Sequence, residues 1–209
     1  MNGTNRRAVT GVVLNDGVYW FLYSVEDNPE IIAGVVQGNS TAQNGALTSS
    51  DATDFSVERG IPPTLNASVN GNYMMKQILN GTITYQSQNN AQEKFTTTYD
   101  NDYESAPDID AVAGKYTGSV ALNETAEVTV SPEGGISGQS STGCIFTGSF
   151  SPRTQGNVFD VTITFGGQPA CGNRNDTVKG IGFFHAGKLY SAALNADRTN
   201  GVAFLGTKS

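Results

Sequence analysis

The chain has 209 residues, a formal net charge of −7, and 15% charged against 37% hydrophobic residues. The negative charge opposes binding to phosphate backbones, so a nucleic-acid partner is not expected. No run of about 18 apolar residues is present that would span a bilayer as a helix. Low charge combined with 25 glycines is typical of short strands joined by tight turns. We therefore predict an all-β fold.

The N-terminal half opens with a predicted hairpin. Asp16 and Gly17 separate two apolar runs, residues 10–14 and 18–23, and Asp-Gly is a strong hairpin signal because glycine accepts the positive φ of the turn. Residues 50–58 have the N-cap and the acidic first turn of a short helix. Further strands are expected at residues 31–36, 65–69, 73–79, 81–86 and 93–99.

The densest aromatic cluster lies on the second strand of this hairpin and consists of Tyr19, Trp20, Phe21 and Tyr23. A strand that is apolar on both faces is either covered on both sides or carries a contact surface. Two interpretations stay open: packing in a core or between domains, and a surface that binds a partner or lines a ligand site. These four residues are our candidate interaction surface.

An acidic segment that contains a proline, residues 100–110, is the best candidate for a domain linker. We predict an N-terminal β-unit at residues 1–104, a linker at 105–110 and a C-terminal domain at 111–209. The domain boundary rests on composition alone.

The same acidic segment resembles the start of a calcium-binding loop, because its acids recur at alternate positions. The resemblance ends at Ser105, where the loop needs glycine for a sharp turn, and at Ala111, where a bidentate glutamate would stand. We therefore predict a solvated acidic linker and no metal site.

The clearest strand lies at residues 157–165, where Phe159, Val161, Ile163 and Phe165 alternate with mainly polar residues. Successive strand side chains point to opposite faces, so one face of this strand is predicted to pack on a core. The second half contains about eight such strands in meander order, which is enough to close a small barrel whose interior is filled or holds one small ligand. A two-sheet β-sandwich is the alternative.

Cys144 and Cys171 are the two cysteines of the chain. No C-x-x-C motif or Cys/His ligand set accompanies them, so a zinc site is not expected. A disulfide and a pair of buried free thiols are the two alternatives, and we predict the disulfide. Such a bond implies an oxidising compartment, for example the periplasm or the cell surface.

No catalytic constellation stands out in the sequence. A G-x-S-x-G elbow is absent, and His185, the only histidine, is interpreted as a residue of a surface turn without ligand partners. No pair among the nineteen acids is distinguished as a glycosidase pair. We predict a protein that is not an enzyme and has no cofactor; a hydrolase would require a cleft with converging acids of perturbed pKa.

Residues 10–38 and 179–207 share a pattern of a short strand, a glycine-containing turn, an aromatic strand, an Asp/Asn turn and a third strand with a terminal glycine. The two interpretations are an internal repeat and chance similarity between glycine-rich hairpins.

Three segments of the second half resemble uncharacterised envelope lipoproteins of Gram-negative bacteria. They are residues 143–153 (G-C-I-F-T-G-S-F-S-P-R), 157–167 (N-V-F-D-V-T-I-T-F-G-G, with Cys171 shortly after) and 189–207 (L-Y-S-A-A-L-N-A-D-R-T-N-G-V-A-F-L-G-T). The plan of a barrel with an accessory β-unit is also similar to surface lipoproteins of the transferrin-binding-protein type. The resemblance implies export, a lipid anchor on a cysteine upstream of residue 1, and a barrel-like C-terminal unit; it carries over no binding residue.

These observations favour a non-enzymatic lipoprotein of the periplasm or the outer-membrane surface that acts as a binding or interaction module. The alternative is a carrier of a small apolar ligand inside the barrel. Residues 1–5 contain no charged-then-apolar signal segment, so we expect that Met1 was placed on a mature fragment whose native signal peptide had been removed. The partner is expected to be an unknown protein or small ligand.

Overall fold

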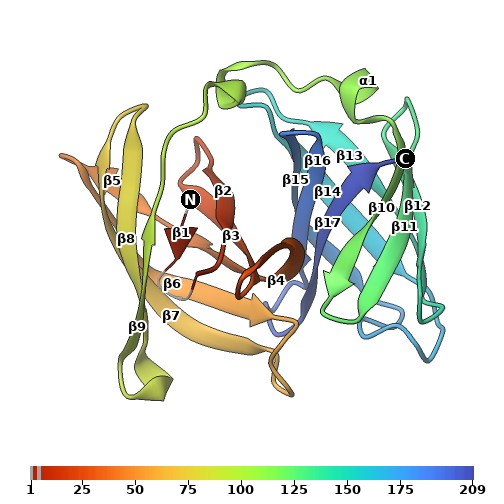
Figure 1. The fold of residues 1–209 in the computed structure, drawn as a ribbon, viewed down its shortest axis with the longest axis horizontal. Coiled ribbons are helices and arrows are strands. Elements are labelled where there is room, and N and C mark those ends of the chain that lie inside the picture. Colours follow the sequence, from red (N-terminus) through yellow and green to blue (C-terminus); the bar gives the residue numbers. More distant parts are fainter. Residues whose placement is uncertain (1, 4–5) are drawn as a thin grey trace.

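The computed structural model describes residues 2–3 and 6–209. Residues 1, 4 and 5, which belong to the segment expected to begin a mature fragment, lie outside the described residues. The all-β prediction is confirmed, and the described strands pair antiparallel in two sheets that lie side by side (Figure 1). The second sheet is a closed eight-stranded barrel, so the barrel is confirmed over the sandwich. Among the described residues, no helix combines the length and the apolar character that crossing a membrane requires.

The first sheet is a curled half-barrel with the strand order β1-β9-β8-β7-β6-β4-β3-β2, and β5 pairs with β6 beside this path. Its strands are β1 (Asn2–Gly3), β2 (Val9–Val13), β3 (Val18–Val25), β4 (Asn28–Asn39), β5 (Thr41–Gln43), β6 (Ala46–Ser56), β7 (Thr64–Met74), β8 (Ile78–Tyr85) and β9 (Ala91–Thr96).

The barrel is a meander in which each strand pairs with the next, and the pairing of β10 with β17 closes it. Its strands are β10 (Gly114–Ala121), β11 (Glu124–Val130), β12 (Gly135–Ser140), β13 (Ile145–Pro152), β14 (Phe159–Phe165), β15 (Thr177–His185), β16 (Lys188–Leu194) and β17 (Gly201–Lys208).

Three short helical turns occur in the described part of the chain. They are η1 (Gln86–Gln88), η2 (Asn101–Glu104) and α1 (Ile109–Val112). The last two lie on the segment that leads from the half-barrel to the barrel, and Figure 1 shows α1 over one end of the barrel. Val112 is buried in the barrel core, where its carbonyl accepts a 2.6 Å hydrogen bond from the Tyr116 hydroxyl. This turn therefore closes that end of the barrel.

The alternation predicted for β14 is confirmed. Phe159, Val161, Ile163 and Phe165 are buried in the barrel interior, whereas Asp160 between them is exposed. One inward and one outward row along each strand are what a small filled barrel requires. The interior is therefore a packed core over much of its length.

Strand β3 is covered on both faces, which explains why its sequence is apolar throughout. Tyr19 and Phe21 point into the core of the half-barrel, whereas Trp20 and Leu22 point into a second core at the junction with the barrel. The junction core joins β3 and β4 to the outer face of the last barrel strands, including Ile181. The two sheets are thus packed together through a shared apolar layer.

The two segments with a similar pattern both form three-stranded meanders, β2-β3-β4 and β15-β16-β17. They pack on each other at the junction, where Trp20 and Leu22 meet Ala192 and Leu205 in one core. The interpretation as an internal repeat stays a prediction.

The short helix expected at residues 50–58 is wrong, because this segment continues β6 up to Ser56. Its acids do not serve a helix N-terminus. Asp54 is buried and bonded to side chains of other strands, and Asp51 accepts hydrogen bonds from Asn39 of β4. Tertiary partners therefore override the local helix signal.

The chain passes from the half-barrel to the barrel through residues 97–113. Independent folding of the predicted units 1–104 and 111–209, with a linker at 105–110, stays a prediction.

Candidate functional site

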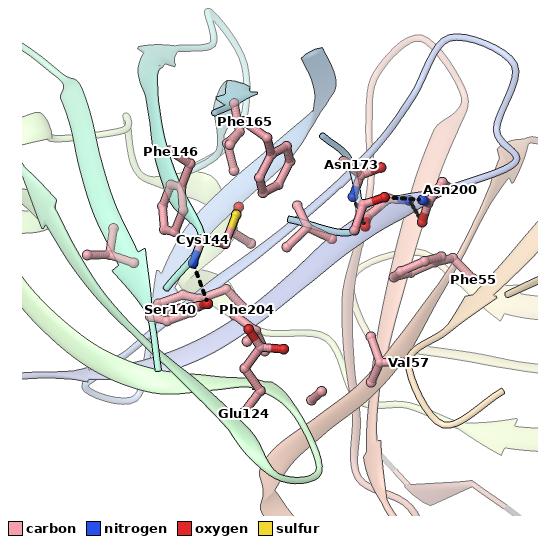
Figure 2. Close-up of a pocket in the computed structure, with 18 of the residues that line it drawn as sticks. Phe55, Val57, Glu124, Ser140, Cys144, Phe146, Phe165, Asn173, Asn200 and Phe204 are labelled. Carbon is pink, nitrogen blue, oxygen red and sulfur yellow. Dashed lines mark hydrogen bonds between the residues drawn. The ribbon is translucent and has the colours of Figure 1, made fainter. Parts of the chain in front are cut away.

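A cavity of about 310 Å³ lies in the barrel interior at the end opposite α1. We call it the barrel cavity. Its walls are mainly apolar side chains that point inward from the barrel strands, and Figure 2 shows Phe146 and Phe165 on one side with Phe55 and Val57 of the half-barrel on the other. A concave, mostly apolar space with few polar groups is the usual form of a small-molecule site.

The cavity exists because the two ends of the barrel are filled differently. Near α1, Val112, Tyr116, Phe159 and Ile109 contribute to the packed core. At the other end the strands finish in turns, and small residues such as Ala121, Ala170, Gly172 and Gly201 line the cavity there. Small side chains leave space that the phenylalanines of β13 and β14 do not occupy.

The mouth of the barrel cavity is covered in part by the turn between β6 and β7, which contributes Val57, Arg59 and Pro63. Arg59 holds this turn in place. Its guanidinium donates to the Pro63 carbonyl at 3.0 Å and pairs with the Asp54 carboxylate at 2.9 Å. The half-barrel therefore supplies one side of a site whose other walls belong to the barrel.

Asp54 anchors this turn from a buried position, with 3% of its side chain exposed. Its carboxylate accepts hydrogen bonds from the hydroxyls of Tyr23 at 2.6 Å and Tyr85 at 3.1 Å. Burial, together with the Asp54 carboxylate, raises the pKa of both tyrosines. Both phenols stay protonated and can donate to Asp54 throughout the neutral range.

The predicted disulfide between Cys144 and Cys171 is confirmed. It joins the turn after β12 to the loop after β14, with a sequence separation of 27 and a Cα–Cα distance of 4.8 Å. Cys144 lines the barrel cavity. The bond therefore fixes part of the rim, and it indicates an oxidising, exported environment.

The polar groups at the rim are mostly bonded to one another. The Thr142 hydroxyl donates to Glu124 at 2.6 Å, and the amide of Asn173 donates to the Gly201 carbonyl at 2.7 Å. The Asn173 Oδ1 atom is buried and has no hydrogen-bond partner among the described residues. A buried acceptor without a partner is a place where a ligand donor or an ordered water would be stabilised.

This arrangement is suited to binding. Glu124 is the single carboxylate among the described residues that line the barrel cavity. The apolar walls offer burial to an apolar molecule.

The aromatic cluster predicted as an interaction surface lies mainly inside the protein. Tyr19, Trp20 and Phe21 are buried, and Tyr23 is half-buried with its hydroxyl on Asp54. These positions correspond to the core-packing interpretation of the cluster. Phe21 reaches the wall of a second cavity, which residues of the half-barrel line together with Phe183, Phe184 and His185 of β15.

The second cavity has a volume of about 560 Å³ and lies between β2, the turn from β7 to β8, and the segment that follows β9. We call it the half-barrel cavity. Its wall is apolar at Val9, Val13 and Leu79, and its rim carries Asp100 and His185. The structure therefore brings His185 and the acidic segment together, which sequence analysis treated as unrelated.

The contributions of Phe55, Arg59 and Asn173 to the barrel cavity were not predicted from the sequence. No local pattern marks them: Phe55 lies in the segment expected to be a helix, and Arg59 and Asn173 lie outside the strands whose bounds were predicted. The signal that was available was the pair of cysteines, because Cys144 lines the barrel cavity and Cys171 is followed directly by the lining residues Gly172 and Asn173.

Searches against protein families and curated proteins found no matching family model and no matching protein.

Proposed function

We propose that the protein is an exported, non-enzymatic binding protein that holds a small, mainly apolar molecule in the barrel cavity. The observation that carries this proposal is the unfilled apolar space of about 310 Å³ inside an otherwise packed barrel. Protein interiors contain few voids of this size, because an unfilled cavity lowers the free energy of unfolding. A cavity that is kept therefore favours a role in binding. The volume is at the low end of the range for small-molecule sites.

The ligand class follows from the walls. Phenylalanine and valine side chains would bury an apolar body, and each Å² of apolar surface removed from water contributes roughly 25 cal/mol. The unpartnered Asn173 Oδ1 would favour one hydrogen-bond donor on the ligand. A strongly charged ligand would lose its hydration without a partner of opposite charge deep in the barrel.

Two observations support a location in the cell envelope: the Cys144–Cys171 disulfide, and the resemblance of the second half to envelope lipoproteins. We propose that the protein is a lipoprotein of the periplasm or the outer-membrane surface, anchored by a lipid on a cysteine upstream of residue 1. Metabolic labelling of the full-length natural protein with a fatty acid, followed by fractionation of the envelope, tests this placement.

Binding is tested with the apolar fluorescent probe N-phenyl-1-naphthylamine and by mass spectrometry of an organic extract of the purified protein. We expect probe fluorescence to rise on binding at a single site. Val128→Phe places a ring in the cavity from β11 and should weaken probe binding at least tenfold. Thr129→Phe adds the same ring on the outer face of the same strand and is the matched control.

A second pair of variants tests the proposal if Val128→Phe does not fold. Ala121→Trp blocks the mouth from a half-buried position, and Leu122→Trp places the same indole on an exposed neighbour. Equal probe binding in Val128→Phe, Ala121→Trp and their controls would overturn the proposal. An extract without any bound molecule, combined with no probe binding, would also overturn it.

A protein partner is a second candidate, and one observation favours it. Met74 and Met75 are exposed by 53% and 77% at the turn from β7 to β8. Methionine is an adaptable contact residue, and large exposed apolar side chains often mark interaction sites. A partner captured from envelope extract by the wild type, and lost with Met74→Glu and Met75→Glu, would support this candidate.

A further inference from the structure

Three side chains that can ligate a metal converge at the rim of the half-barrel cavity. Asp100 and Asp102 belong to the segment that crosses from the half-barrel to the barrel, and His185 is the last residue of β15. One donor atom of each lies within 4.8 Å of the others. None of the three lines the barrel cavity, so this site is separate from the proposed ligand site.

The backbone on both sides is held in place. The Asp100 Oδ1 atom accepts a 2.9 Å hydrogen bond from the Asp102 amide, which leaves its Oδ2 atom toward His185. The Tyr99 amide donates to the Gln77 carbonyl at 2.7 Å and so ties this segment to the turn after β7. His185 pairs with Lys188 across a two-residue turn, in which glycine at position 187 has a φ of +80°.

The distances suit a shared ion. The His185 Nδ1 atom lies 3.1 Å from Asp100 Oδ2 and 3.6 Å from Asp102 Oδ2. Nitrogen and oxygen ligands bind Zn²⁺ at about 2.0–2.2 Å, so two ligands at a tetrahedral angle are about 3.3–3.6 Å apart. The distance from His185 Nδ1 to each carboxylate is therefore close to the one that a shared ion requires.

The charges also favour a cation. In the part of the chain that the structure describes, Asp100 and Asp102 form no ion pair with a lysine or arginine; both face His185, which is charged only if protonated. By contrast, the nearby Glu104 is already paired with Lys76 at 2.8 Å. Within the described part of the chain, the two carboxylates therefore have no lysine or arginine paired with them to neutralise their negative charge, and a bound cation would do so.

We propose that Asp100, Asp102 and His185 bind a divalent transition-metal ion, with Zn²⁺ as the best match. An imidazole nitrogen with two carboxylate oxygens is a borderline donor set that suits zinc, whereas Ca²⁺ prefers six to eight oxygen ligands. The ion would join the crossing segment to the barrel hairpin. All three residues line the half-barrel cavity, so the remaining coordination positions would be open to it.

The competing explanation is a simple ion pair between protonated His185 and the two carboxylates, and the experiment separates the two. The protein is prepared without a histidine tag, stripped with a chelator and titrated with Zn²⁺ by calorimetry. We expect one binding site, and at least tenfold weaker binding for His185→Gln, Asp100→Asn and Asp102→Asn.

The matched control is Asp108→Asn. Asp108 caps α1 through a 3.0 Å bond from the Asp110 amide, just as Asp100 caps η2, but it has no ion pair with His185. Asparagine keeps the capping oxygen in both variants, so folding is preserved. Zn²⁺ affinity should be unchanged in Asp108→Asn.

NMR of the imidazole gives a second readout, because His185 is the only histidine in the chain. Zn²⁺ should fix a single tautomer with Nδ1 bound to the metal. No saturable Zn²⁺ binding at one site, equal affinity in His185→Gln, or imidazole resonances that Zn²⁺ leaves unchanged would each overturn the proposal. Ca²⁺ binding of equal strength that does not depend on His185 would also overturn it.

Discussion

The backbone amide of Ile32 donates a 2.9 Å hydrogen bond to the hydroxyl of Ser119, which joins β4 of the half-barrel to β10 of the barrel. Both residues are buried, with 1% and 8% of their surface exposed. The Ser119 hydroxyl thus accepts a hydrogen bond from a backbone amide of the half-barrel, at the place where β4 packs on the outer face of the barrel. The packing of the two sheets depends on this bond as well as on the apolar layer beside it.

Replacing Ser119 by alanine should destabilise the protein by about 1–3 kcal/mol, because it leaves the buried Ile32 amide without an acceptor. Urea unfolding followed by the fluorescence of Trp20, which lies in the junction core, measures the loss. Ser137→Ala on the exposed side of β12 is the control and should change stability by less than about 0.5 kcal/mol. An equal, small effect of both variants would show that the amide finds another partner.

Replacing both cysteines by alanine should lower the free energy of unfolding by about 3 kcal/mol, because the bond closes a loop over a sequence separation of 27. The same change frees the loop after β14 from the rim of the barrel cavity. We therefore expect weaker probe binding even at temperatures where the variant stays folded. Thermal unfolding with and without the probe measures both effects; unchanged probe affinity would mean that the rim is held by the strands alone.

Arg59→Met should destabilise the protein by about 3 kcal/mol, because it leaves the buried Asp54 carboxylate without its cation. Arg6→Met breaks an exposed pair with Glu26 and should cost less than about 0.5 kcal/mol. Adding Asp54→Asn to Arg59→Met should recover part of the loss. If the double variant is no more stable than Arg59→Met, the unpaired charge is not the cause.

Stability should fall above pH 10. Burial raises the pKa of Tyr19 to about 12, whereas a tyrosine in the unfolded chain ionises near its usual value of about 10. Between these values the folded state binds more protons than the unfolded state, so stability decreases as pH rises. The raised pKa values of Tyr23 and Tyr85 act in the same direction.

Tyr19 alone should account for about 2–3 kcal/mol of this loss between pH 10 and 12. Urea unfolding at a series of pH values measures it. Tyr19→Phe loses the 3.1 Å hydrogen bond to Ser49 and should be less stable at pH 8, but its stability should fall less steeply above pH 10. An identical slope in the variant and the wild type would rule out Tyr19 as a contributor.

Much of the fold could be predicted because short-range sequence patterns determine its strands and turns. Alternating residues such as Phe159 and Val161 identify β14 without any knowledge of its neighbours, and the Asp16–Gly17 pair marks the turn between β2 and β3, where Gly17 has a φ of +87°. The pairing of Cys144 with Cys171 needed no topology, since only two cysteines are present.

The sites could not be predicted because they depend on contacts between distant segments. Asp54 looks like a residue of a first helical turn until Tyr23, Tyr85 and Arg59 surround it. His185 lacks partners in sequence, and only the path of the crossing segment brings Asp100 to its ring. The apolar faces of β3 showed that the strand would be covered, but not what would cover it.

Through the turn α1, the segment that connects the two sheets also covers one end of the barrel. Val112 is buried in that interior and Ile109 packs against it, and Asp108 starts the turn. A barrel fragment expressed alone would therefore have to begin upstream of Asp108. A fragment that begins after Val112 would lose the carbonyl that accepts the hydrogen bond of the Tyr116 hydroxyl.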